Sequence, residues 1–344
     1  MRVLAMLHLY SPNHNAGAEV AAHALLRTLV GRGHQVVVQL SQVHPMFHTG
    51  PYVYDGVSVW PYRDKDDPLR WINSPTPPQL IVAHLENAIR ASILGSMHKI
   101  PSAILMHNTY TKSKADLRWG AGLVVYNTEW MRADVERWWE SNQGTTPPRG
   151  IVVHPPIFPD QYRITPPPAR AGCVTLVNLY KEKGSAMFYA LAERFPRQRF
   201  LGVCGAYGKQ DVRSGLPNVE IVQHVAAHEM PARVYSRTRV LLAPSSYESY
   251  GRVAVEAACS GIPTIAHPTS GLVEALGEGG TFADRDDVDA WAGALRGLLT
   301  PRGWVAASAR ARAVADRLDT AGDLERWAVE AERLSRAVRA PVLV

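Results

Sequence analysis

Short apolar runs alternate with helical patterns along the first half of the chain. Arg2–His8 and Gln35–Leu40 are continuous apolar runs of strand length, and Ala18–Val30 between them carries apolar residues at helical spacing. Continuous apolar runs indicate strands that are buried on both faces, as in parallel sheets covered by helices. Further runs of this kind are Val57–Trp60, Gln79–Ala83, Ser102–Met106, Gly122–Tyr126 and Gly150–His154. The alternation predicts a doubly wound α/β fold.

A second series of the same kind follows a proline-rich stretch. Prolines cluster at Pro147–Pro148, Pro155–Pro156 and Pro166–Pro168, which is typical of a linker. The strands expected after it are Cys173–Asn178, Arg199–Cys204, Val219–Gln223, Val240–Ala243 and Pro263–Ala266. The helices expected after it are Gly184–Phe195, Met230–Arg237, a helix behind Gly251, and the chain from Val288 onward. We therefore expect two Rossmann-like domains, residues 1–164 and 165–319.

Composition limits the class of protein. A chain of 344 residues is long enough for two ordinary domains, each with its own core. Its three cysteines are few and odd in number and stand in apolar surroundings, which favours a reducing compartment over a disulfide framework. No apolar segment approaches the length of a membrane span, so we expect no transmembrane segment and a cytoplasmic location. The net charge of +6 fits an anionic small ligand, a nucleic acid or a lipid surface equally well.

The segment Pro244–Gly271, PSSYESYGRVAVEAACSGIPTIAHPTSG, carries the strongest chemical signal. Glu248 follows the apolar run Val240–Ala243, so it lies on a strand-to-helix loop, where parallel sheets bind ligands. Glu256 lies further along in the following helix, among apolar neighbours that suit an unpaired carboxylate poorly. The N-terminus of that helix offers free N–H groups and the positive end of a dipole, which suit a phosphate.

This segment resembles the E-x7-E motif of retaining GT-B glycosyltransferases of family 4, P-S-x-x-E-G-F-G-x-x-x-x-E-A-x-A-x-G-x-P-V. The matching residues are Pro244, Ser245, Glu248, Gly251, Glu256, Ala257, Gly261 and Pro263. Ser249 replaces the usual glycine and Tyr250 the usual phenylalanine. The resemblance covers nearly the whole chain and is thinnest between Ser41 and Gln79. It implies two Rossmann-like, doubly wound parallel-sheet domains that face a cleft, with a C-terminal helix (residues 320–344, expected over Thr320–Val338) that crosses back to the first domain.

Further motifs extend the resemblance to the start of the second domain. The family pattern G-R-x-x-x-x-K-G, whose cations neutralise the diphosphate, is matched by Lys183, while Asn178 stands in place of the arginine. Lys181 could partly supply the missing charge, and an ordinary solvated lysine is the alternative for Lys183. Gly205 and Val225 correspond to the loops that flank the nucleotide base, with His224 in place of a usual glycine.

The first domain carries two further candidates. His107 ends a buried strand, and the resemblance gives a histidine at this place that faces the sugar across the cleft; a purely structural histidine is the alternative. The loop before Ala18 resembles the family's G-G-A-E turn, with Ala16 in place of the first glycine and with Gly17 and Glu19 matched. Gly17 would then let a phosphate or an acceptor approach the backbone. The alternative, that Gly17 only permits the turn and Glu19 only favours the helix N-terminus, stays open.

The resemblance implies a glycosyltransferase that moves a sugar from a nucleotide-diphospho-sugar to an acceptor with retention of configuration. It gives Glu248, Lys183 and His107 catalytic roles, and it makes Asn178, Gly205, Val225, Ser249, Tyr250, Gly251, Glu256 and Gly17 donor-binding. The nucleotide-sugar is a co-substrate, and no cofactor is expected. The two D-x-D strings, Asp64–Asp66 and Asp284–Asp286, follow no buried strand, so neither is expected to hold a metal. The acceptor stays open among saccharide, lipid, protein and modified nucleobase.

Three other functions remain for this fold. A sugar-nucleotide epimerase shares the GT-B plan and needs no acceptor. A dehydrogenase fits Rossmann-like halves, but the chain lacks a G-x-G-x-x-G fingerprint and a ribose-binding acid. A non-catalytic sugar- or nucleic-acid-binding relative would keep the fold with damaged catalytic positions, against which Glu248, Glu256 and Lys183 argue.

Overall fold

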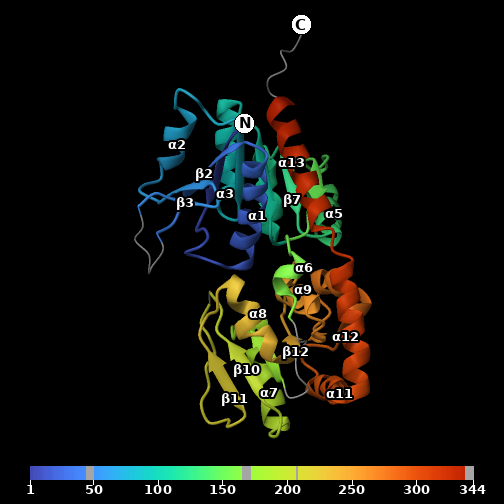
Figure 1. Ribbon diagram of the computed structural model, residues 1–344. Coiled ribbons are helices and arrows are strands. Elements are labelled where there is room, and N and C mark those ends of the chain that lie inside the picture. Colours follow the sequence, from blue (N-terminus) through green and yellow to red (C-terminus); the bar gives the residue numbers. More distant parts are fainter. Residues whose placement is uncertain (44–49, 165–171, 207, 338–344) are drawn as a thin grey trace. The chain divides into compact units, whose positions relative to one another are not determined.

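The computed structural model describes residues 1–43, 50–164, 172–206 and 208–337. The chain divides into two compact units (Figure 1). The first unit comprises Met1–Pro156 and the chain from Thr320, and the second comprises Ile157–Asp319. Helix α6 (Pro159–Tyr162) lies in the second unit because Tyr162 packs into that unit's core. The linker prolines Pro166–Pro168 fall outside the described residues.

The first unit is built on a sheet in the order β3-β4-β2-β1-β5-β6-β7-β8, in which only β3 runs antiparallel to its neighbour. The strands are β1 (Arg2–Leu7), β2 (Gln35–Leu40), β3 (Tyr52–Tyr54), β4 (Val57–Trp60), β5 (Leu80–His84), β6 (Ser102–Met106), β7 (Leu123–Tyr126) and β8 (Gly150–Val152). The helices are α1 (Gly17–Gly31), α2 (Asp67–Ile72), α3 (Asn87–His98), α4 (Thr111–Asp116), the 3-10 turn η1 (Leu117–Trp119), α5 (Glu129–Gln143) and α13 (Thr320–Ala337).

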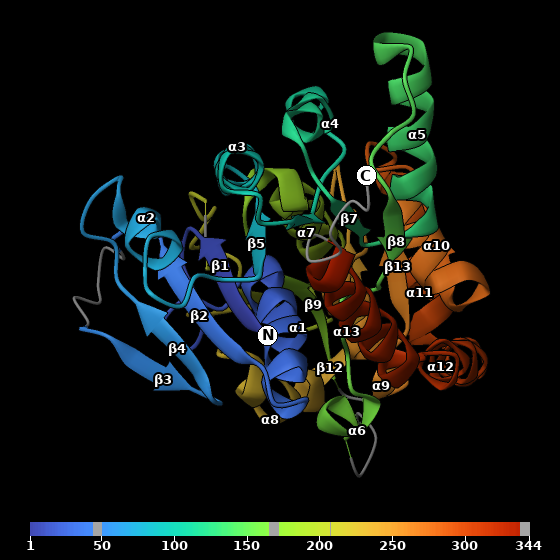
Figure 2. The ribbon, with the colours of Figure 1, turned by 90° about the horizontal axis from the view of Figure 1, so that it is seen from above.

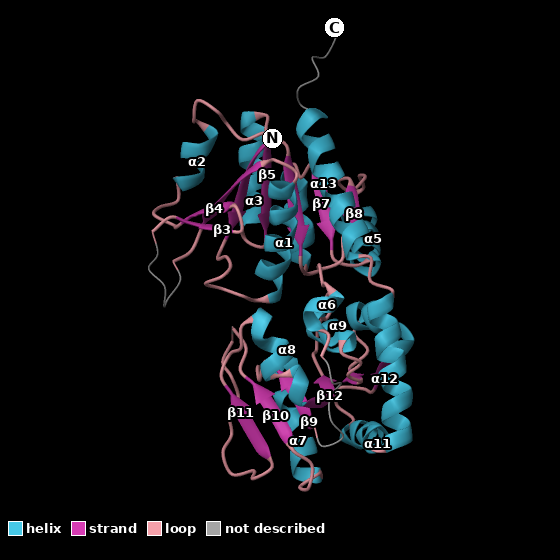
Figure 3. Cartoon of the chain, viewed as in Figure 1, coloured by secondary structure: helices cyan, strands magenta, loops and turns pink. Residues whose placement is uncertain are grey.

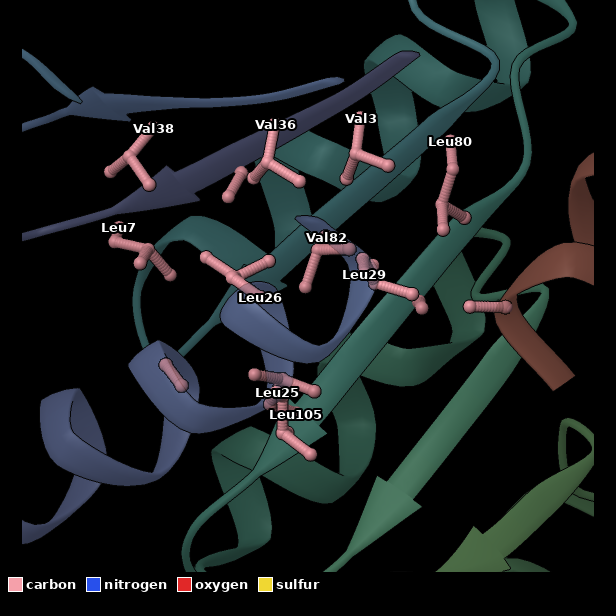
Figure 4. Packing of buried hydrophobic residues seen from close by; sticks show 14 of the residues in the cluster. Val3, Leu7, Leu25, Leu26, Leu29, Val36, Val38, Leu80, Val82 and Leu105 are labelled. Atoms are coloured by element: carbon pink, nitrogen blue, oxygen red, sulfur yellow. The ribbon is translucent and has the colours of Figure 1, made fainter. Parts of the chain in front are cut away.

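Apolar side chains cover both faces of this sheet. Val3 and Leu7 of β1 point to the face where Leu25, Leu26 and Leu29 of α1 pack (Figure 4). Leu4 and Met6, the alternate residues of the same strand, pack on the other face with α3 and α5. Burial of both faces is the reason that the strands are continuously apolar, as the sequence predicted.

Helix α13 completes the first of these faces. It lies beside α1 (Figure 2), and the fully buried Trp327 donates a hydrogen bond from Nε1 to the carbonyl of Leu25 at 3.0 Å. Arg32 at the end of α1 pairs with Glu332 at 2.8 Å. The helix expected from Thr320 is therefore part of the first unit, and its expected last residue, Val338, falls outside the described residues.

The second unit holds an all-parallel sheet in the order β11-β10-β9-β12-β13-β14, of which Figure 3 labels β11, β10, β9 and β12. The strands are β9 (Cys173–Val177), β10 (Phe200–Val203), β11 (Val219–Val222), β12 (Thr238–Ala243), β13 (Thr264–Ala266) and β14 (Gly280–Phe282). The α-helices are α6, α7 (Ser185–Arg194), α8 (Met230–Arg233), α9 (Arg252–Cys259), α10 (Ser270–Leu276), α11 (Val288–Leu299) and α12 (Pro301–Asp316). The 3-10 turns are η2 (Lys181–Lys183), η3 (Ala227–Glu229), η4 (Tyr235–Arg237) and η5 (Gly277–Gly279).

One expectation about local structure needs correction. The helix expected over Met230–Arg237 is α8 followed by the separate 3-10 turn η4, because the side chain of Thr238 bonds the carbonyl of Val234 at 2.8 Å and turns the chain into β12. Helices α2, α3, α4, α6 and α10 were not expected. The prediction of two doubly wound parallel-sheet domains is confirmed. No helix among the described residues is long and apolar enough to cross a membrane.

Candidate active site

Lys183 and Glu248 meet at the carboxyl edge of the second unit's sheet. Lys183 ends the turn after β9, and Glu248 lies on the loop after β12, the neighbouring strand. Nζ of Lys183 lies 2.5 Å from Oε1 of Glu248, and the hydroxyl of Ser245 donates to the same oxygen at 2.9 Å. A Cβ at Gly184, whose φ is +90°, would lie 2.4 Å from Pro244, so only glycine lets the two loops approach this closely.

Arg285 ties the lysine loop to a third strand. Its guanidinium donates to the carbonyls of Glu182 and Lys181, each at 2.8 Å, and the backbone N–H of Ser246 donates to Glu182 as well. Arg285 follows β14, inside the string Asp284–Asp286. Sequence reasoning missed this role, since nothing local connects Arg285 with residues about a hundred positions earlier.

The start of α9 is shaped by close backbone approach. Gly251 has φ +86°, and a Cβ there would lie 2.4 Å from Leu272. A Cβ on Gly271 would lie 2.3 Å from the carbonyl oxygen of Glu248 and 2.5 Å from the backbone of Ser249. Tyr250 is buried in the core of the second unit. The loop from Glu248 therefore reaches the N-terminus of α9 in one defined conformation.

Glu256 has protein partners on both carboxylate oxygens. The hydroxyl of Tyr235 donates to Oε2 at 2.8 Å, and Arg252, one helical turn earlier, donates to Oε1 at 3.0 Å. Burial raises the pKa of the Tyr235 hydroxyl well above its ordinary value, and the Glu256 charge adds to the rise. Burial opposes the charge on Arg252, but Glu256 and Tyr162 together outweigh it and raise the pKa of the guanidinium. The sequence indicated that Glu256 needs polar partners; it did not identify them.

Asn178 organises the ends of β9 and β10 from a buried position. Its φ is +71°, and its Oδ1 accepts from the backbone of Tyr180 at 3.2 Å and from Gln210 at 3.0 Å. Gln210 in turn accepts from the N–H of Gly205 at 2.8 Å, and a Cβ on Gly205 would lie 2.2 Å from Cγ of Asn178. Asn178 and Gly205 are thus brought together, whereas the side chain of Val225 is buried in the core.

His107 and Gly17 lie in the first unit, at the carboxyl edge of its sheet. Gly17 is the exposed first residue of α1, and His107 directly follows β6. His107 does not stand alone: its Nε2 lies 3.1 Å from Nδ1 of the buried His84, which sequence reasoning missed. His84 in turn contacts His8, and His8 contacts Glu19.

Each D-x-D string folds into a local turn. In both strings the first aspartate accepts the backbone N–H of the second, Asp66 onto Asp64 at 2.7 Å and Asp286 onto Asp284 at 3.0 Å. These side-chain contacts close the turns.

The fold is that of GT-B glycosyltransferases, with two parallel-sheet Rossmann-like domains. Solved structures that share it include Anabaena Alr3699/HepE in complex with UDP-glucose, with a TM-score of 0.77 and 17% identity over 97% of this chain and 100% of that one. Sucrose-phosphate synthase from Thermosynechococcus elongatus gives a TM-score of 0.75 and 16% identity over 98% and 99% of the two chains.

Residues 172–301 match the family model described as "Glycosyl transferases group 1", so the second unit contains a domain of that family. D-inositol 3-phosphate glycosyltransferase of Corynebacterium urealyticum is 27% identical over 72% of this chain. The enzyme of that name from Mycobacterium marinum is 38% identical over 26% of this chain. The chain spans 62% and 20% of the length of these two relatives, respectively.

Proposed function

We propose that the protein transfers a sugar from a nucleotide-diphospho-sugar to an acceptor hydroxyl, with retention of configuration and without a metal ion. The observation that carries the proposal is the Lys183–Glu248 pair, held at 2.5 Å beside the N-terminus of α9 within the group 1 glycosyl transferase domain. A cation and a carboxylate at one sheet edge, followed along the chain by the positive end of a helix dipole, match the charges of glycosyl transfer from a diphosphate.

Each part of this edge has a chemical role in the proposal. Breaking the bond between sugar and phosphate leaves positive charge on the sugar and negative charge on the diphosphate. Lys183 and the N–H groups that open α9 stabilise the departing phosphate, while the Glu248 carboxylate orders sugar hydroxyls and opposes the cationic ring. Glu256 binds the ribose, with Tyr235 and Arg252 fixing its orientation. Gly205 and Asn178, which pack against each other at the ends of β10 and β9, bind the nucleotide.

The relatives indicate which substrates to test first. One solved relative contains UDP-glucose, and the curated relatives are named for D-inositol 3-phosphate. UDP-glucose is therefore the first donor, and inositol 3-phosphate the first acceptor.

The experiment is a donor and acceptor screen with product analysis. Purified protein is incubated with UDP-, GDP- and ADP-sugars in turn, with and without acceptor, and nucleoside diphosphate release is measured together with the anomeric configuration of the product by NMR. We expect acceptor-dependent release and an α-linked product from an α-linked donor. An inverted product would contradict retention, and isomerisation of the donor without an acceptor would replace transfer by the epimerase function.

A further inference from the structure

Four titratable side chains are connected in series at the carboxyl edge of the first unit's sheet. His8, His84 and His107 stand at the ends of β1, β5 and β6, three adjacent parallel strands. Nε2 of His107 lies 3.1 Å from Nδ1 of His84, and Nε2 of His84 lies 3.1 Å from Nδ1 of His8. Nε2 of His8 lies 3.1 Å from Oε1 of Glu19, a buried residue in the first turn of α1.

The imidazoles in this series are neutral at neutral pH. Burial lowers the pKa of His107 to about 4, with a further contribution from the charge of His8. Burial, then the neighbouring histidines, lowers the pKa of His84 well below its ordinary value. Burial also lowers the pKa of His8, against the opposing effect of the Glu86 carboxylate. A neutral imidazole has one N–H donor and one bare acceptor nitrogen, so each ring that donates on one side must accept on the other.

The charge of Glu19 therefore sets the direction of every hydrogen bond in the series. A carboxylate can only accept, so His8 donates to it from Nε2 and accepts at Nδ1 from Nε2–H of His84. His84 in turn accepts at Nδ1 from Nε2–H of His107. All three rings are then Nε2–H tautomers, and Nδ1 of His107 carries a lone pair. None of the residues that the structure describes hydrogen-bonds to that nitrogen.

His8, Glu19 and His84 are also close enough together to be considered as ligands of one metal ion, with one atom from each within 4.8 Å of the others. The short contacts favour a hydrogen-bonded series instead. His8 meets His84 through Nδ1 and Glu19 through Nε2, and the two nitrogens of one imidazole point in different directions, so a single ion cannot replace both contacts.

We propose that these four side chains form a hydrogen-bonded relay in which Glu19 fixes the tautomer of His107, so that Nδ1 of His107 accepts a hydrogen bond from a ligand hydroxyl. Glu19, His8 and His84 are positioning residues that act through His107. The assignment of that hydroxyl to a sugar or an acceptor rests on the proposed function. The direction of the relay does not, since it follows from the first unit's own contacts.

Protonation of Glu19 reverses the relay without charging any ring. A proton taken up at Nδ1 of His107 displaces the Nε2 proton to Nδ1 of His84; the Nε2 proton of His84 moves to Nδ1 of His8, and that of His8 moves to Glu19. One proton has entered, Glu19 has become a neutral acid, and His107 now donates from Nδ1. Burial raises the pKa of Glu19 to about 7, with the Glu86 charge adding and backbone hydrogen bonds opposing. Among the described residues, His14 is a further titratable neighbour, with Nε2 4.0 Å from Oε2 of Glu19.

The test observes ring tautomers directly and needs no turnover. Full-length protein with 15N-labelled histidine is followed by two-bond 1H–15N correlation NMR between pH 6 and 9, with the three rings assigned from single His→Gln variants. We expect Nε2–H tautomers for all three rings at high pH and a joint change toward Nδ1–H on acidification. The relay would be overturned if the tautomers of the three rings changed independently, or if His107 were Nδ1–H at high pH. Tight binding of one equivalent of Zn²⁺ to all three rings would also overturn it.

Two matched variants separate the relay from general charge effects. Glu19→Gln keeps the shape but can both donate and accept, so His107 should become a tautomer mixture that no longer changes with pH. Glu86→Gln removes a nearby exposed carboxylate outside the series. In this variant the tautomers of the three rings should still change together with pH. If Glu19→Gln leaves His107 purely Nε2–H, the relay is wrong.

If the protein transfers sugars as proposed, the same variants are compared in turnover. Glu19→Gln should lower kcat/KM about tenfold, the effect of one hydrogen bond, and remove the pH dependence near 7 that Glu86→Gln retains. Joint tautomer changes in a protein without transferase activity would uphold the relay and refute the proposed function. A wild-type pH profile in Glu19→Gln would overturn the relay's part in turnover.

Discussion

Replacing Lys183 by alanine tests whether the Lys183–Glu248 pair serves a ligand or only joins two loops. Lys183 and Glu248 are mostly buried, with 22% and 20% of their side chains exposed. A hydrogen bond from a cation to a phosphate contributes about 1.5–3 kcal/mol, and each 1.4 kcal/mol changes a dissociation constant tenfold. We therefore expect Lys183→Ala to weaken binding of UDP by roughly 10- to 150-fold.

Glu248→Gln makes the opposite prediction for the same ligand. In the free protein the Glu248 carboxylate engages Lys183, so it competes with a diphosphate for the ammonium and repels it. Neutralising Glu248 should leave UDP affinity unchanged or tighter, while turnover with the sugar donor falls, because its proposed partner is the sugar. A pair that only joins loops would weaken UDP binding similarly whichever partner is removed.

Titration calorimetry with UDP measures both effects, and thermal unfolding confirms that the variants are folded. Lys181→Ala is the matched control: Lys181 is exposed on the same turn, and an exposed charge contributes below about 1 kcal/mol, or a loss of less than about fivefold. Unchanged UDP affinity in Lys183→Ala would refute the phosphate role of Lys183. Equal losses in Lys183→Ala and Glu248→Gln would show a structural bridge instead.

Three further predictions concern other parts of the molecule. Activity should survive EDTA, since both D-x-D strings close backbone turns; a complete loss restored by Mg²⁺ or Mn²⁺ would contradict this. Gly271→Ala should lower both activity and the unfolding temperature, by a few degrees at least, because its Cβ would lie 2.3 Å from the carbonyl oxygen of Glu248; a variant with wild-type values of both would show that the loop adapts freely. The free energy of unfolding should fall as pH drops from 6.5 toward 4, because unfolding lets His84 and His107 take up protons that their lowered pKa values exclude in the fold. Glu19 has a raised pKa, so its contribution to the free energy of unfolding increases as pH falls from about 7. Glu19→Gln removes that contribution and should make the loss of stability toward acid pH steeper. A flatter profile in this variant would contradict the predicted sign.

The strands could be predicted from the sequence because both sheet faces are buried. β2, β4 and β6 begin and end where the apolar runs do. Helix α3 gave a weaker signal: its buried face is made largely of Ala88, Ala91 and Leu94, and no side chain caps its start. Helix α10 is short, and its one cap is Thr269, whose hydroxyl accepts from Leu272. Small residues and single caps carry little information without the tertiary packing that selects them.

The candidate site was predictable only where a residue lies on the loop that follows a strand. Lys183, Glu248 and His107 have that position, and the family resemblance supplied their roles. His8 and His84 end strands in the same way, but only the sheet order shows that they adjoin His107. Arg285 and Tyr235 act through partners distant in sequence. Contacts of this kind depend on the fold and leave no local pattern in the chain.

The contribution of α13 to the first unit has a consequence for biosynthesis. The ribosome makes all of Ile157–Asp319 before it reaches Thr320, so the second unit can fold while the first still lacks a helix. Until then the α1 surface that receives Trp327 is uncovered, and an exposed apolar surface of this kind favours aggregation. A nascent chain stalled before residue 320 is therefore expected to bind chaperones through its earliest-made part. Residues 157–319 produced alone should fold, whereas residues 1–156 alone should not remain soluble without the segment that begins at Thr320.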